Sequence, residues 1–123
     1  MQELEIGGVK FRVEYRHFGG DRGPAVRVYG DVDGREVELL RFDCFEKDPH
    51  YHYDPGDKDH RWNLDPLTMG DPTAFSLAQI ETRLKDMIAK AGYEAVAARV
   101  DQCAVASNIS QIKAAIEAAK AAV

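Results

Sequence analysis

Alternation of apolar and polar residues runs through the first half of the chain. Leu4 and Ile6 alternate with polar neighbours, the pair Gly7-Gly8 follows, and the alternation resumes over residues 9–16. This spacing is typical of two half-buried antiparallel strands joined by a tight turn. The glycine-rich segment 18–24 fits neither a phosphate-binding loop nor a dinucleotide fingerprint, and we interpret it as a plain connection.

A second pair of strands is predicted over residues 25–30 and 35–45. We expect a four-residue loop between them, because a two-residue turn would set Asp31 opposite Glu36, and like charges directly opposite destabilise a sheet. The apolar positions change parity within the second strand. This change indicates either a bulge near Leu39-Leu40 or a sheet that is covered on different faces at its two ends.

Residues 41–55 form the next predicted hairpin, with its turn at Glu46–Pro49, since proline cannot donate to a ladder and aspartate favours turns. The expected register sets Asp43 opposite His52. Successive side chains point to opposite faces of a strand, so the hairpin has an apolar face and a polar face. The apolar face carries Phe42, Cys44, Tyr51 and Tyr53, and the polar face carries Arg41, Asp43, His50, His52 and Asp54.

The second half of the chain has helical spacing. One more short strand is expected over residues 60–64, with His60 on the polar side. The pair Asp71-Pro72 is typical of a helix start, and apolar residues then recur at steps of three and four as far as Gly92. Similar spacing predicts helical structure over residues 93–105 and a last helix over 109–123.

These elements predict an α+β protein, an antiparallel sheet of four to six strands packed by two or three C-terminal helices. A length of 123 residues fits one domain, with strands mainly in residues 1–66 and helices mainly in residues 71–123. The apolar stripe of the last helix has two readings. It packs on the sheet of its own chain, or it forms the seam of a homodimer.

Charge is spread unevenly. The formal net charge is -5, and residues 43–71 hold eight acidic side chains against three of Lys or Arg, together with three of the four histidines. An acidic segment rich in imidazole disfavours a broad nucleic-acid surface and suits cations better. We expect neither a signal peptide nor a membrane span, and the two cysteines are expected to be reduced and buried. We therefore expect a cytoplasmic protein.

The polar face of the predicted hairpin carries the candidate chemistry. His50 and His52 lie two residues apart on one strand, so both imidazoles are available to one divalent metal, with Asp43, Asp54 or His60 completing the ligand set. The alternative is a metal-independent acid/base site in which Asp43 orients His52 and Arg41 stabilises an anion. A third reading is a set of ordinary surface pairs between the strands.

Two resemblances add to this reading. The stretch LLRFDCFEKDPHYHYDP, at residues 39–55, resembles members of a small bacterial family of unknown function. The strand ELLRFD and the His-rich strand after it are similar to predicted ribonuclease toxins of toxin–antitoxin pairs. That second resemblance implies a catalytic set of Arg41, Asp43, His50 and His52.

The sequence thus predicts a small bacterial cytosolic protein with a His/Asp/Arg-rich hairpin face. A hydrolytic, nuclease-like site is the first hypothesis for that face. A non-catalytic binding or dimerisation module and a metal-binding module are the alternatives.

Overall fold

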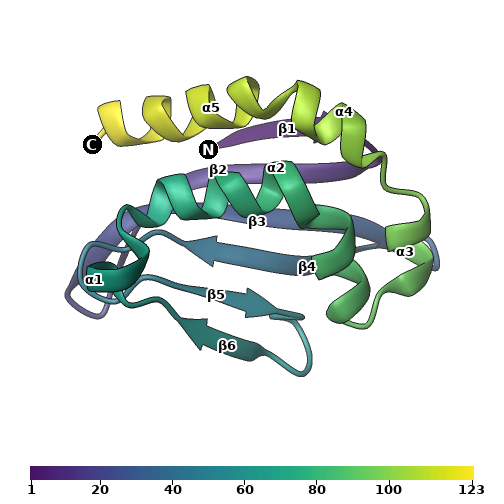
Figure 1. Cartoon of the computed structure of the whole chain (residues 1–123), viewed down its shortest axis with the longest axis horizontal. Helices are drawn as coiled ribbons and strands as arrows, with labels where there is room; N and C mark the ends of the chain where they lie inside the picture. Colours follow the sequence, from purple (N-terminus) through teal and green to yellow (C-terminus); the bar gives the residue numbers. More distant parts are fainter.

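The computed structural model describes residues 1–123 and contains one six-stranded antiparallel sheet. Its strands follow one another in chain order from edge to edge (Figure 1). They are β1 (Gln2–Ile6), β2 (Val9–Phe18), β3 (Asp21–Val32), β4 (Arg35–Asp43), β5 (His50–Tyr53) and β6 (His60–Asn63). The predicted α+β class is confirmed.

Five helices follow the strands. They are α1 (Pro66–Met69), α2 (Pro72–Lys90), α3 (Glu94–Ala98), α4 (Gln102–Ser107) and α5 (Ile109–Ala121). The two long helices lie across one face of the sheet, α5 on β2 and β3 and α2 on β4 and β5 (Figure 1). None of the five has both the length and the apolar character needed to cross a membrane.

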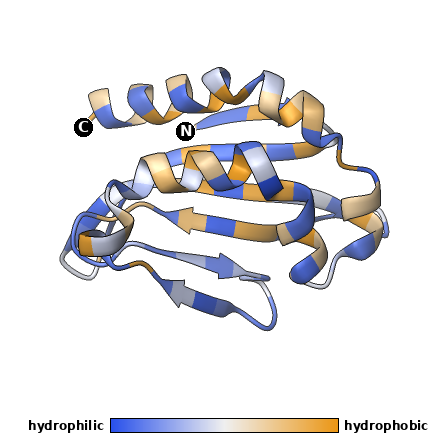
Figure 2. Ribbon diagram, viewed as in Figure 1, coloured by the Kyte–Doolittle hydropathy of each residue, from blue (hydrophilic) through white to orange (hydrophobic).

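The core lies between the sheet and the long helices. Phe11 and Phe42 from the strands and Ile80, Leu84 and Ile116 from the helices are almost completely buried. Burial of such side chains is the main force holding the two layers together. In Figure 2, β4 carries hydrophobic as well as hydrophilic residues, whereas β5 and β6 are hydrophilic. The apolar stripe of α5, one reading of which was a dimer seam, packs within the chain.

Three tight turns connect the first four strands, and two of them differ from the predicted connections. Each turn is formed by two residues that both have positive φ. The three pairs are Gly7-Gly8, Gly19-Gly20 and Asp33-Gly34. Such turns match the right-handed twist of paired strands. The segment 18–24 is therefore mostly strand and not a loop. The four-residue loop is also wrong, because Val32 pairs with Arg35 and Asp31 lies opposite Glu36 after all.

The predicted bulge in β4 is confirmed. Val28 pairs with Leu40 and Tyr29 with Glu38, so Leu39 is the extra residue. Leu39 and Leu40 are both fully buried. The bulge changes the parity of the strand and so places the charged residues after it on the face that the helices leave uncovered. We call this the open face.

The helical half matches the prediction over α2, and residues 93–105 are helical as predicted apart from a break between α3 and α4. The chain between them rests on the β1–β2 turn. The Asp101 amide donates to the Gly7 carbonyl at 2.9 Å, and the Asp101 side chain caps α4 by accepting from Ala104. Asp101 and Gly7 are far apart in the sequence, and their hydrogen bond interrupts the helical structure that the local apolar spacing favours. Both cysteines are free, but only Cys44 is buried.

Candidate functional site

The β4–β5 hairpin brings the predicted polar residues together in a register different from the expected one. Asp43 pairs with His50, and Arg41 pairs with His52. The predicted pairing of Asp43 with His52 is therefore wrong by two residues. The two faces are nevertheless correct, because a shift of two keeps every side chain on its side of the sheet.

Contacts with β3 and the turn before it set this register. Beyond β4 the chain continues along β3, with the Cys44 amide donating to the Pro24 carbonyl at 2.9 Å. The carboxylate of Asp21 then accepts hydrogen bonds from the amides of Lys47 (3.0 Å) and Asp48 (2.8 Å). The connection to β5 is consequently wider than the predicted four-residue turn.

Asp43 is the centre of the cluster, with a side chain only 1% exposed. Four cationic or imidazole side chains surround its carboxylate. Arg16 Nη1 lies 2.9 Å from Oδ1, and Arg41 Nε (3.1 Å), His50 Nε2 (3.0 Å) and His52 Nε2 (3.4 Å) all lie near Oδ2. Burial by itself raises the pKa of Asp43, but the two imidazole hydrogen bonds and the two arginine charges outweigh it and hold the pKa well below its ordinary value. Asp43 is an ionised, buried carboxylate.

The outer nitrogens of both histidine rings are held by oxygen acceptors. His50 Nδ1 lies 2.8 Å from the Asp48 carbonyl, and His52 Nδ1 lies 2.6 Å from the Asp59 carboxylate. These two oxygens only accept, so each ring donates from Nδ1, and each Nε2 faces the Asp43 carboxylate, which also only accepts. Arg41 Nη2 lies 3.3 Å from His52 Nε2. All four ring nitrogens therefore have a partner.

Small residues on β3 make room for the cluster. Gly23 lies opposite Arg16 and Ala25 lies opposite Asp43, so the Arg16 side chain crosses β3 to reach the carboxylate. A Cβ at Gly23 would lie 2.1 Å from the Cys44 carbonyl oxygen, so glycine is required there. The Phe45 ring covers His50 edge-on, with the ring centroids 5.5 Å apart.

Two predicted ligands lie outside the cluster. Asp54 turns into the β5–β6 connection, where it accepts hydrogen bonds from the Lys58 amide and the Tyr93 hydroxyl. Burial, with this contact added, raises the pKa of Tyr93 to about 12. His60 is exposed and pairs with Tyr53, so it lies on the helix side of the sheet. The expectation that His60 joins the polar side is wrong.

The sequence analysis missed Arg16 and Asp59. Arg16 is the last polar position in the predicted alternation of this strand, which was a usable signal, but the pattern does not show that its side chain reaches the His-rich hairpin. Asp59 lies in a loop, at a positive φ of 51°, where no periodic pattern indicates its direction. Only the closed β5–β6 connection brings it to His52.

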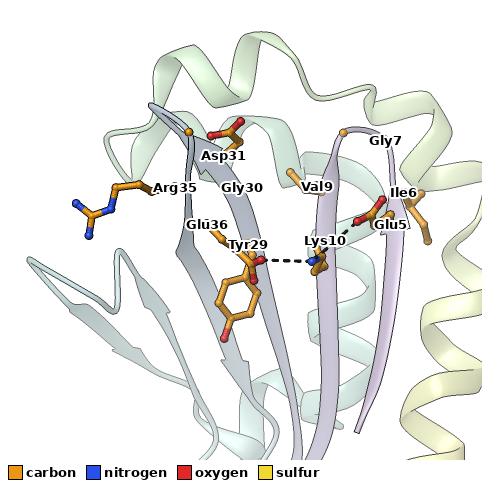
Figure 3. A pocket seen from close by; sticks show the side chains of 12 residues that line it. Glu5, Ile6, Gly7, Val9, Lys10, Tyr29, Gly30, Asp31, Arg35 and Glu36 are labelled. Atoms are coloured by element: carbon orange, nitrogen blue, oxygen red, sulfur yellow. Dashed lines mark hydrogen bonds and ion pairs between the residues drawn. The ribbon is translucent and has the colours of Figure 1, made fainter.

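A second feature of the open face is a hollow of about 500 Å³ at the other end of the sheet, between the β1–β2 and β3–β4 turns (Figure 3). Lys10 lies between Glu36, at 3.3 Å, and Glu5, at 3.9 Å. Tyr29 forms part of the lining, and the Arg12 guanidinium lies 4.2 Å from its ring centroid. No predicted site residue lines this hollow.

Comparison with known proteins identifies the family. The chain belongs to the family described as "Domain of unknown function (DUF7700)", which matches residues 3–116. The predicted membership of a family of unknown function is confirmed, whereas the bacterial origin and the toxin resemblance stay predictions. No curated protein and no solved structure gives a match.

Proposed function

We propose that this chain is a metal-binding module in which Asp43, His50 and His52 hold one divalent transition-metal ion. The observation that carries the proposal is the position of His50 between two acceptors, the Asp48 carbonyl and the Asp43 carboxylate. With its proton on Nδ1, the Nε2 lone pair faces a carboxylate oxygen. A contact of 3.0 Å between these two groups requires a cation, either a second proton or a metal ion.

The arrangement of the three residues favours the metal ion. Their ligand atoms all lie within 4.8 Å of one another. Two ligands of a tetrahedral zinc ion, each about 2.0–2.1 Å from the metal, are roughly 3.3 Å apart. The distances from Asp43 Oδ2 to the two Nε2 atoms are 3.0 and 3.4 Å. Metal-binding histidines commonly donate their other ring N–H to an oxygen acceptor. The Asp48 carbonyl and the Asp59 carboxylate are in that position here.

Two imidazoles and one carboxylate select the class of metal. This donor set suits zinc, iron(II), cobalt or nickel, whereas magnesium and calcium prefer oxygen alone. For the ion to bind, Arg41 must move away from Asp43 Oδ2, a displacement open to a side chain that is 18% exposed. The buried histidines, each 7% exposed, keep their places.

A metal-independent acid/base site has less support. General acid or base catalysis needs a ring nitrogen within reach of a substrate proton, and all four nitrogens of His50 and His52 are engaged within the protein. The nuclease-like hypothesis therefore stays a prediction that depends on opening the cluster or on a bound ion.

The test is zinc binding by calorimetry on metal-free protein without a His-tag. We expect one zinc ion per chain, and loss of this binding in the His50→Ala/His52→Ala variant, because two of three ligands are removed. The variant His17→Ala/His60→Ala is the matched control and should bind as the wild type does. Equal zinc affinity in both variants would overturn the proposal.

A second variant separates metal binding from folding. Asp59 has a side chain 48% exposed, so Asp59→Asn should cost little stability. It weakens the acceptor that orients His52 and should reduce zinc affinity about 10- to 100-fold. Unchanged affinity in a folded Asp59→Asn protein would show that the ring does not act as an oriented ligand.

A further inference from the structure

Arg16 is the least engaged charged group of the cluster. It donates one hydrogen bond, to Asp43 Oδ1 at 2.9 Å, although a guanidinium carries five N–H donors. Its planar head lies near the rings of Phe18 and Phe45, at 5.6 and 5.8 Å from their centroids. The Arg16 side chain is 22% exposed, so its remaining N–H donors lie at the solvent-accessible edge of the Asp43 cluster.

A divalent ion would reverse the local charge. The ion pairs around Asp43 link three arginines to three carboxylates, and Asp59 adds a fourth through His52. The linked groups are Arg16, Arg27, Arg41, Glu14, Glu38, Asp43 and Asp59. Leaving the histidines aside, these three arginines and four carboxylates sum to one net negative charge. A bound divalent ion turns it into one net positive charge and competes with both arginines for Asp43.

From these observations we infer that the metal-loaded cluster binds a phosphate group, with Arg16 and Arg41 donating to its oxygens beside the ion. This inference rests on the metal site proposed above. The guanidinium fork fits the paired oxygens of phosphate, and a partly buried site strengthens charge attraction relative to water. Because the metal-free cluster has no net positive charge, phosphate binding should depend on the metal.

Cobalt(II) provides the test, because its visible spectrum reports both metal binding and a change of ligands. Cobalt-loaded protein is titrated with inorganic phosphate and, separately, with dimethyl phosphate, which distinguishes a free or monoester phosphate from a diester. We expect a saturable spectral change with at least one of the two probes. Metal-free protein, followed by calorimetry, should bind each probe at least tenfold more weakly.

Arg16→Gln should weaken phosphate binding at least tenfold while the cobalt spectrum persists. Arg16→Lys, which keeps the charge but loses the planar fork, should give an intermediate loss. Arg12→Gln is the matched control, since Arg12 lies on the same face but pairs with Glu3 and Glu36, and it should bind as the wild type does.

The outcomes separate the two proposals. Absence of a cobalt spectrum would overturn the metal site itself. A normal cobalt spectrum that neither probe changes, or equal binding to metal-free protein, would overturn the phosphate site and leave the metal site standing. A change that Arg16→Gln and Arg12→Gln affect equally would also overturn the assignment to Arg16.

Discussion

At one end of the open face, Arg16 and Arg41 pair with Asp43; at the other end, Lys10 and Arg12 pair with Glu36. In both groups, basic side chains of β2 reach across β3 to a carboxylate of β4. They differ in depth. The side chain of Asp43 is 1% exposed, and that of Glu36 is 41% exposed.

This difference decides what each group contributes. Water solvates Glu36 and its partners in the folded and the unfolded chain, so their attraction adds little. Asp43 is buried away from water, and contacts with its four cationic or imidazole neighbours take the place of hydration. Removal of one member then leaves buried charges without compensation. The same residue types form exposed ion pairs at one end of the sheet and a buried ionised cluster at the other.

The largest expected effect is that of Asp43→Asn. This change should lower the free energy of unfolding by about 3 to 5 kcal/mol, because the arginines and imidazoles lose their buried counter-charge. Urea denaturation of metal-free protein measures it, with Glu36→Gln as the control of the same chemistry. A loss below about 1 kcal/mol, the size expected for exposed pairs, would show that Asp43 is not the centre described.

Acid should have an intermediate effect. The pKa of Asp43 is lower in the folded chain than in the unfolded chain, so its contribution is fully present above the ordinary pKa of about 3.9. It is lost as the pH falls below that value, because the unfolded chain takes up the proton more readily. Denaturant titrations of metal-free protein between pH 6 and pH 2.5 should show a steeper loss in the wild type than in Asp43→Asn. Parallel curves would contradict the lowered pKa.

The smallest effect is expected at the exposed end. Glu36→Gln should change the free energy of unfolding by about 0 to 1 kcal/mol, and the change should shrink as salt is added, because exposed pairs are screened. Unfolding measured at low and at high sodium chloride checks this. A loss that salt leaves unchanged would place Glu36 in the same category as Asp43 and remove the contrast between the two ends.

Much of the fold was predictable from the residues. Alternation identified the strands, and the change of parity in β4 located the bulge that the structure places at Leu39. The Asp-Pro start and the spacing of apolar residues identified α2. The predicted connections between strands were less accurate. A turn such as Asp33-Gly34 is set by backbone conformation, whereas its prediction compared only cross-strand side-chain pairs.

The sequence by itself determined which residues of the His-rich hairpin share a face, because a period of two assigns each side chain to one side of the sheet. Only the tertiary structure decided the partners. A shift of two residues keeps the faces and changes every pair, and this shift follows from contacts of the loop after β4 with Asp21 and Pro24. Likewise Arg16 reaches Asp43 across β3, where the strand partner of Arg16 is Gly23 and that of Asp43 is Ala25.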